Sequence, residues 1–446
     1  MTHLVQSTPQ IDAYLADCDR LAGSATEPSW LRNLRRKGIE HFADAGFPTT
    51  RDEEWKFTSV ASIADRHFAP AHGGHGNLAT DLVEGWAGAL GGYRLVLVNG
   101  GHAPQFSVGA LPAGVHVGSL RSILATNPAV VEPFLGRLAP PDRQAFTALN
   151  TGFLRDGAFV WIPPGTIIEE PISLLFMSAS PEIASVSHPR VLIVAGDHSQ
   201  ARIVEGYAGP PGQEYFTNAV TEVVVGSGAV VDHYKVQRES QRASHIGSMY
   251  VQGTRDSIFS SHSIAFGGAL VRNEIIAVLD GEGGDCTLNG LYLVDDRRLI
   301  DNHTTIDHAK PHCSSHEMYK GILSGHARAV FNGKIIVRPD AQKTDAKQTN
   351  KALLLSDDAQ INTKPQLEIF ANDVKCTHGA AVGQLDEDAI FYLRARGLDR
   401  QQARDMLIHA FAGDVLNRIR IDGLRKSLEE HLLSELPVAG GAANQP

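Results

Sequence analysis

Short runs of valine, isoleucine and leucine, each closed by a glycine or aspartate turn, recur through the middle of the chain and constrain its fold most strongly. Examples lie at 191–197, 223–228, 277–286 and 353–358. Successive runs are roughly 30 residues apart, with one long gap near residue 300, and such a period is typical of solenoids. Because the region from about 150 to 385 shows almost no helical periodicity, we predict a β-helix. A β-sandwich with irregular strands is the alternative.

Helical patterns lie on both sides of this region. Residues 10–48 contain two apolar stripes at helical spacing. Helical spacing returns after Asp386, a good N-cap residue, and continues to about residue 433. The segment 51–58 surrounds Trp55 and Phe57 with charged residues. We expect this segment to fasten the N-terminal helices to the part of the chain that follows.

These patterns divide the chain into four parts. We expect an N-terminal helical region at 1–90, a β-helix core at 91–385 and a C-terminal helical region at 386–436. The last residues, 437–446, are small and polar and are expected to be disordered. A loop rich in glycine and histidine is expected at 70–80.

Charge and cysteine content restrict the possible partners and the compartment. A formal net charge of −10 argues against a broad nucleic-acid surface and against docking on anionic lipid. The cysteines at 18, 286, 313 and 376 are far apart and form no Cys-x-x-Cys, which indicates a reducing cytosol. The sequence starts without a secretory signal pattern, and no uncharged apolar run approaches the length of a membrane span. We therefore expect a cytoplasmic protein that binds neither nucleic acid nor membrane.

The stretch 366–388 joins a predicted strand, two potential ligands and the start of the C-terminal helices. If the first half is a strand, alternation places Cys376 and His378 on one face, just before Gly379. A thiol and an imidazole can both bind iron or a sulfur species. The alternative is a small buried thiol, because two such residues make no closed metal site by themselves.

A second group of potential ligands lies between residues 301 and 316. His303, His308, His312, Cys313 and His316 could bind a metal ion, but their spacing fits no fixed ligand template. Polar turn and packing roles are therefore favoured. The chain also has no Walker A loop and no Gly-x-Ser-x-Gly elbow, so any linked ATP chemistry is expected from a partner.

A series of longer motifs resembles one known family. The matching segments are 54–58 (Glu-Trp-Lys-Phe-Thr), 311–316 (Pro-His-Cys-Ser-Ser-His), 319–321, 331–334, 340–345, 364–369, 373–386 and 391–398. In this order they resemble the SufB/SufD family of scaffold subunits for iron–sulfur cluster assembly in the SUF system, and within it the SufD members. The match is dense from about 300 to 420 and thinner before that.

The resemblance implies a right-handed parallel β-helix between two helical regions. It also implies a non-catalytic subunit that pairs with SufB through its last strands and docks the ATPase SufC on its C-terminal helices. On this basis, deleting 386–433 is expected to abolish SufC binding while leaving the β-core folded. The Cys-x-His of the family's SufB interface corresponds to Cys376 and His378. A transient iron–sulfur cluster would form there together with SufB, and no permanently bound cofactor is expected in the isolated chain.

Three other readings remain open. SufB itself is a close alternative, but Gly379 stands where SufB has an acidic residue, and Asn350 lies near the position of its essential cysteine. A metal-dependent β-helix hydrolase would use the histidines at 303–316. An inert structural solenoid would tolerate replacement of Cys376 and His378.

Overall fold

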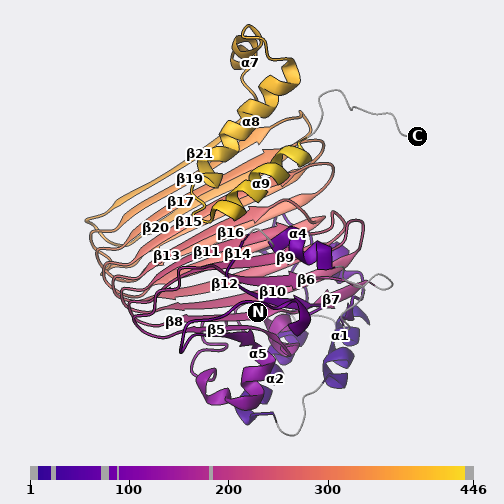
Figure 1. Ribbon diagram of the computed structural model, residues 1–446, viewed down its shortest axis with the longest axis vertical. Coiled ribbons are helices and arrows are strands. Elements are labelled where there is room, and N and C mark those ends of the chain that lie inside the picture. The colour runs from indigo at the N-terminus through magenta and orange to yellow at the C-terminus, as the bar shows by residue number, and fades with distance from the viewer. Residues whose placement is uncertain (1–8, 22–26, 72–79, 88–89, 180–183, 437–446) are drawn as a thin grey trace.

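The computed structural model describes residues 9–21, 27–71, 80–87, 90–179 and 184–436. In this part of the chain, two parallel β-sheets stack into a solenoid, and helices cover the outer face of each sheet (Figure 1). The predicted solenoid of β-strands is therefore confirmed. Most of the predicted glycine- and histidine-rich loop (72–79) and the predicted disordered tail (437–446) lie outside the described residues.

From β8 onward, successive strands of the chain alternate between the two sheets, and sheet A contains the even-numbered ones. Its members are β4 (His116–Ser119), β5 (Gly157–Ile162), β8 (Arg190–Ala195), β10 (Tyr215–Val225), β12 (Ser244–Gly253), β14 (Leu270–Leu279), β16 (Leu299–His308), β18 (Arg328–Val337) and β20 (Gln360–Ile369), with β1 (Ala69–Pro70) and β7 (Ser185–Ser187) joined at the side.

Sheet B contains the strands that alternate with them. Its members are β2 (Tyr93–Val98), β3 (Gly101–His102), β6 (Ile172–Met177), β9 (Gln200–Ala208), β11 (Val230–Arg238), β13 (Ile258–Ala265), β15 (Asp285–Val294), β17 (Ser314–Leu323), β19 (Asp345–Leu354) and β21 (Lys375–Gly383).

Each pair of consecutive strands forms one rung, and equivalent residues of successive rungs stack in register. In sheet A, for example, Leu270 pairs with Leu299, Leu299 with Arg328, and Arg328 with Gln360. Alternate residues point inward, where their apolar side chains form a continuous core between the sheets. At one of the turns between the sheets, Gly325 adopts a φ of 61°, which favours glycine.

The long gap near residue 300 in the predicted repeat is filled by β15 and β16. The outer face of β16 carries Asp301 and His303, both of which are buried against other parts of the chain. Because these side chains are polar, β16 contains no long apolar run, and its sequence did not predict a strand. The solenoid repeat is therefore uninterrupted from β8 to β21.

The N-terminal helical region covers sheet A. Its helices are α1 (Pro9–Arg20), α2 (Ser29–Ala45), α3 (Ala61–Ala64), α5 (Leu120–Thr126) and α6 (Ala145–Gly152), with 3-10 turns at Glu53–Trp55, Pro104–Phe106 and Pro128–Val130. Tyr14, Phe42 and Phe146 pack into one core with Phe216 and Leu270 of sheet A. Helices α5 and α6 fall inside the range 91–385, which was predicted as β-helix, so the solenoid shares that range with part of its helical cover.

Two of the C-terminal helices, α8 (Arg400–Leu416) and α9 (Asp422–Glu435), lie on sheet B, and α4 (Thr80–Ala87) lies on the same side (Figure 1). Helix α7 (Glu387–Arg394) precedes them in the chain. Asp386 caps α7, and Asp399 forms a capping box with Gln402 at the start of α8, as their sequence positions predict.

Helices α8 and α9 share a hydrophobic core with sheet B. Ile408, Leu424 and Leu428 are buried there with Leu291 and Ile322 of the strands. This shared core argues against the expectation that residues 386–433 can be removed without disturbing the β-core, as far as α8 and α9 are concerned. Helix α7 differs, because it projects past the end of the solenoid (Figure 1). None of the helices in the described ranges has the length and hydropathy needed to cross a membrane.

Candidate functional site

Strand β21, which carries Cys376 and His378, ends the order of sheet B. It pairs with β19 on one side, where Cys376 lies opposite Ala346 and His378 opposite Gln348. No described strand pairs with its other side. The strand begins at Lys375, and residues 370–374 form the turn after β20, so the prediction that the strand runs through the first half of 366–388 is wrong. Cys376 and His378 nevertheless share a face, as predicted, because they are two residues apart on β21.

That shared face points toward the interior of the solenoid. Ala346 and Gln348, the register partners on β19, are buried in the interior row, so Cys376 and His378 stand above this row at its open end. Cys376 is partly buried, and it packs against a small apolar cluster that includes Ile335. Burial and the nearby Asp345 raise the pKa of the Cys376 thiol. His378 is exposed.

A polar column continues below His378 into the solenoid. Gln348 lies under His378 in register, and its Nε2 donates a hydrogen bond of 2.8 Å to Oε2 of Glu317 on the next rung down. Burial raises the pKa of Glu317 to about 7. The interior beneath β21 is therefore polar and titratable instead of purely apolar.

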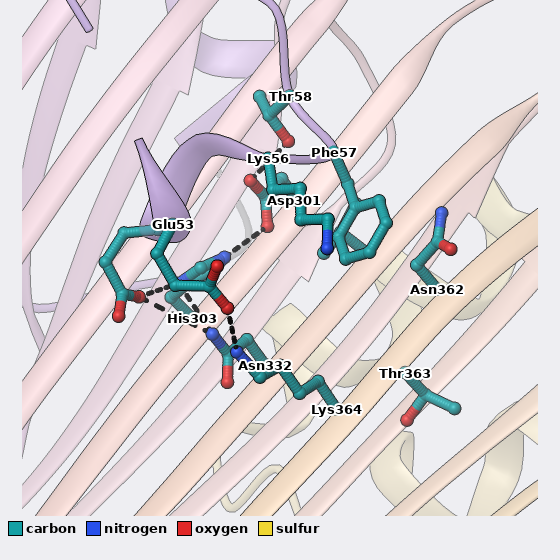
Figure 2. A pocket seen from close by; sticks show the side chains of 12 residues that line it. Glu53, Lys56, Phe57, Thr58, Asp301, His303, Asn332, Asn362, Thr363 and Lys364 are labelled. Atoms are coloured by element: carbon teal, nitrogen blue, oxygen red, sulfur yellow. Dashed lines mark hydrogen bonds and ion pairs between the residues drawn. The ribbon is translucent and has the colours of Figure 1, made fainter. Parts of the chain in front are cut away.

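A second polar site lies where the strap, residues 50–62, crosses the outer face of sheet A. A pocket of about 180 Å³ opens there between the strap and strands β16, β18 and β20 (Figure 2). Thr58 donates a hydrogen bond of 2.5 Å to Asp301 on β16, and Lys364 on β20 pairs with Glu53 at 2.6 Å.

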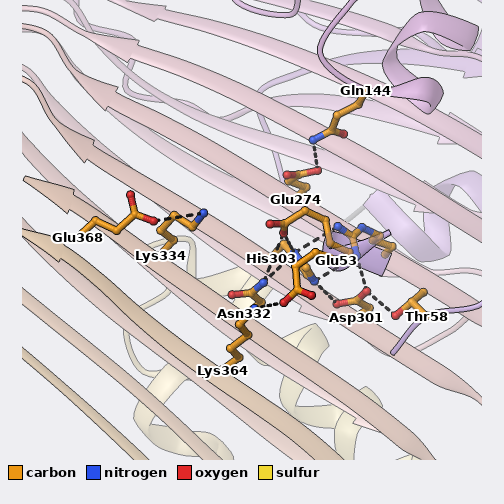
Figure 3. A network of polar contacts seen from close by, with 12 residues as sticks. Glu53, Thr58, Gln144, Glu274, Asp301, His303, Asn332, Lys334, Lys364 and Glu368 are labelled. Carbon is orange, nitrogen blue, oxygen red and sulfur yellow. Dashed lines mark hydrogen bonds and ion pairs between the residues drawn. The ribbon is translucent and has the colours of Figure 1, made fainter. Parts of the chain in front are cut away.

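Arg272 of β14 is the centre of this site. Its guanidinium lies 3.9 Å from the ring centroid of Trp55 and donates to the carbonyl of Glu54 at 2.8 Å and to Asp301 at 2.6 Å. The strap is thereby joined to four successive strands of sheet A, from β14 to β20 (Figure 3). The prediction that residues 51–58 fasten the N-terminal helices to the rest of the chain is confirmed.

His303 is held between two carboxylates in the same network. Its Nε2 lies 3.0 Å from Asp301 Oδ1, and its Nδ1 lies 3.4 Å from Glu54 Oε2. Burial by itself would lower the pKa of His303, but Asp301 and Glu54 outweigh burial and raise it above 6.5. Glu54 of the strap and Asp301 of β16 therefore both favour the protonated form of His303.

We expect the stabilisation by His303 to depend on pH. Because its folded-state pKa is raised, the stabilisation is complete below pH 6.5 and is lost as the pH rises through the folded-state value. Replacing His303→Gln should lower the free energy of unfolding by about 1–3 kcal/mol at low pH and by less at high pH. Urea unfolding across the pH range measures this difference. The matched control is His326→Gln, and a His303 effect that is constant with pH would contradict the assignment.

The structure does not bring the five potential ligands at 303–316 together. His303 faces the strap, whereas His308 points inward, and its Nε2 lies 2.9 Å from Ser315 Oγ. His312 and Cys313 lie in the turn after β16, and the Cys313 thiol donates to the carbonyl of Gly281. His316 is exposed on β17. Among the described residues, no three His, Cys, Asp or Glu side chains are grouped as a metal ion requires.

Sequence reasoning missed a buried charged cluster inside the solenoid. Glu205 lies 3.3 Å from His233, and Lys235 donates to Asn273 at 2.7 Å, all in the interior. Burial would raise the pKa of Glu205, but His233 and Lys235 bring it down to about 2, and burial lowers the pKa of Lys235 to about 8. The alternation of Val231, His233 and Lys235 along β11 was the available signal, because it places them on one face.

Comparison with known proteins identifies the family. The family model for the SUF system FeS cluster assembly SufBD core domain matches residues 176–411, and the model for the SufBD protein N-terminal region matches residues 11–174. An iron–sulfur cluster assembly SufBD family protein of Synechocystis is 34% identical over 423 residues, covering 91% of each chain. Iron–sulfur cluster assembly protein SufD of Escherichia coli is 30% identical and that of Bacillus subtilis 27%; the alignments cover 91% and 90% of this chain, and 92% and 93% of theirs.

Proposed function

Since the chain belongs to the SufBD family of iron–sulfur cluster assembly proteins, we propose that it acts as the SufD-type scaffold subunit. In this role it pairs with SufB along the open end of its solenoid and docks the ATPase SufC on its C-terminal helices. It has no catalytic role of its own, and ATP hydrolysis comes from SufC. The four cysteines are free thiols in the structure, which supports a reducing compartment such as the cytoplasm.

The observation that carries this proposal is the open edge of β21. An unpaired strand edge is a template for a strand of another chain, and here it carries a thiol and an imidazole on its inward face. A SufB strand added next to β21 would continue the interior row and bring its own side chains over Cys376 and His378. The nascent cluster, which is the cargo of the complex, would then lie between the two subunits.

The chemistry of the two side chains suits this role. A thiolate ligates metal, and a histidine must be neutral to do so. Because the pKa of Cys376 is raised in the isolated chain, its thiol stays protonated until a metal or a group from SufB favours the thiolate. His378 is exposed and can ligate directly or accept the thiol proton. Direct ligation by His378 is the sharper form of the proposal.

The exposed surface of α7 supports the docking of SufC. Phe391 is 71% exposed and Tyr392 is 56% exposed, and both lie on the helix that projects past the solenoid. Met406 of α8 is 50% exposed. Large apolar side chains that stand free on a projecting helix are typical of a protein–protein interface.

Replacing His378→Ala should leave the complex with SufB and SufC assembled but impair cluster maturation. Cys376→Ala should be milder, since SufB can supply another soft ligand, and the double variant should fail most completely. Growth of a strain that depends on this pathway measures maturation, and size-exclusion chromatography measures assembly.

Thr377→Ala is the matched control, because Thr377 lies on the same strand and points to the opposite face. It should complement growth fully. Full complementation by the Cys376 and His378 double variant would end the proposal for these residues. If the double variant no longer forms the complex, Cys376 and His378 contribute to packing at the subunit interface instead of to cluster maturation.

A further inference from the structure

A groove of about 710 Å³ runs beside the strap, distinct from the open edge of β21. One wall is the strap, and the other is formed by the first residues of β14, β16, β18 and β20. These residues, Leu270, Leu299, Arg328 and Gln360, stack in register, so the groove crosses four successive strands of sheet A. It ends at β20, the last described strand of the sheet.

The groove is positively charged in a chain whose formal net charge is −10. Lys56, Arg297 and Arg328 line it, and no acidic residue is among its described lining residues. His326 also lines the groove, but it already pairs with Asp358 at 3.6 Å. Lys56, Arg297 and Arg328 form no ion pair within the described part of the chain. These three cations are therefore available to an anionic partner.

The remaining lining indicates what kind of anion fits. Phe57 is 45% exposed on the strap side, and the partly buried Leu299 provides apolar surface on the sheet side, where Leu270 is buried beneath the groove. The three cations are exposed and come from the strap, from the turn before β16 and from the start of β18. A site for a single phosphate concentrates its donors on one point, often with a buried cation. Cations spread along an apolar groove instead suit an extended acidic polypeptide with an apolar side chain.

We propose that this groove receives an acidic, extended segment of the subunit that pairs with the open end of the solenoid. The inference rests on the proposed pairing with SufB. Gln360 and Asn362 line the groove and belong to β20, the last described strand of sheet A, so the groove reaches the same end of the solenoid as the open edge of β21 in sheet B. A partner segment that leaves the added rung and enters this groove would meet Lys56 and Arg328, which line it. Charge pairing there would favour one orientation of the two solenoids.

The test is the affinity of the full chain for SufB, measured by isothermal titration calorimetry at low and at high salt. The double variant with Arg297→Glu and Arg328→Glu should bind SufB about tenfold more weakly at low salt. The difference between wild type and variant should shrink at high salt, because exposed charges are screened. The control is the double variant with Lys37→Glu and Arg121→Glu, which makes the same change in net charge at exposed sites outside the groove.

Each outcome has a defined meaning. If wild type binds SufB and the groove variant binds equally, with the same salt dependence, the inference is overturned and the pairing stands. If wild type does not bind SufB, the pairing and the inference both fail. Titration of the isolated chain with inorganic phosphate should show no saturable binding. Saturable phosphate binding that the groove variant abolishes would overturn the assignment to a polypeptide.

Discussion

A chain that ends at Leu385, without α7, α8 and α9, is expected to lose its cooperative fold instead of retaining an intact β-core. Leu424, Leu428 and Leu432 of α9 are fully buried against sheet B. Replacing one buried leucine by alanine costs about 2–5 kcal/mol, and a domain is stable by only about 5–15 kcal/mol. Removing these helices exposes the part of the outer apolar face of sheet B that α8 and α9 cover, so we expect aggregation on size-exclusion chromatography and a large fall in Tm by circular dichroism.

The companion variant separates docking from folding. Phe391→Asp combined with Tyr392→Asp changes only exposed side chains of α7, so stability should change by no more than about 0.5 kcal/mol per site. Capture of SufC in a pull-down should nevertheless be lost. A truncated chain with the Tm of the full chain would show that α8 and α9 are not part of the core. Undiminished capture by the α7 variant would place SufC docking elsewhere.

Replacing Glu222→Ala should destabilise the fold by about 3–5 kcal/mol. Glu222 and Arg190 form a fully buried ion pair with a closest distance of 2.6 Å. Glu222 also accepts hydrogen bonds from the backbone N–H groups of Gly136, Leu138 and Ala139, at 2.9 to 3.1 Å. The substitution therefore leaves three N–H groups without this acceptor and leaves the buried guanidinium of Arg190 without its anionic partner, with only the neutral acceptors Asn150 and Thr151.

Guanidinium chloride unfolding measures this effect. The matched control is Asp307→Ala, which breaks the ion pair with the exposed Arg338 and should cost about 1 kcal/mol or less. A cost for Glu222→Ala as small as that of the control would show that the buried pair adds little to stability. Replacing both Arg190→Met and Glu222→Leu should recover part of the loss, because it removes the unpaired charge.

The sequence was informative where one local signal decided the structure. Asp386 and Asp399 each precede a helix that they cap, and the apolar runs with their glycine and aspartate turns became rungs of the solenoid. Alternation along a strand also placed Cys376 and His378 on one face. These features depend on neighbouring residues in the chain, so pattern and capping rules suffice to predict them.

The sequence was uninformative where the contacts and burial of a side chain depend on a segment far away in the chain. For His303 the sequence favoured a polar turn or packing role but could not show which, because Glu54, its partner on the strap, is more than 240 residues away, as is Thr58, the partner of Asp301. The deletion of 386–433 was expected to spare the β-core because the sequence of α9 does not show that the helix packs on sheet B. Long-range burial of this kind follows from the assembled rungs and cannot be read from local periodicity.

The open end of the solenoid also has a consequence for dynamics. In a linear stack each rung is stabilised by its two neighbours, so a terminal rung with one neighbour frays most readily. The strap fastens β20 through Lys364, whereas β21 is held by its pairing with β19 and by the ion pair between Lys343 and Asp373 in the adjoining turns. Amide exchange should therefore be fastest in β21 and slow sharply when a partner strand adds to it. If Cys376 and His378 act as proposed, the two side chains would be held rigidly only while the complex is assembled, so that the same strand would first hold a forming cluster and then release it.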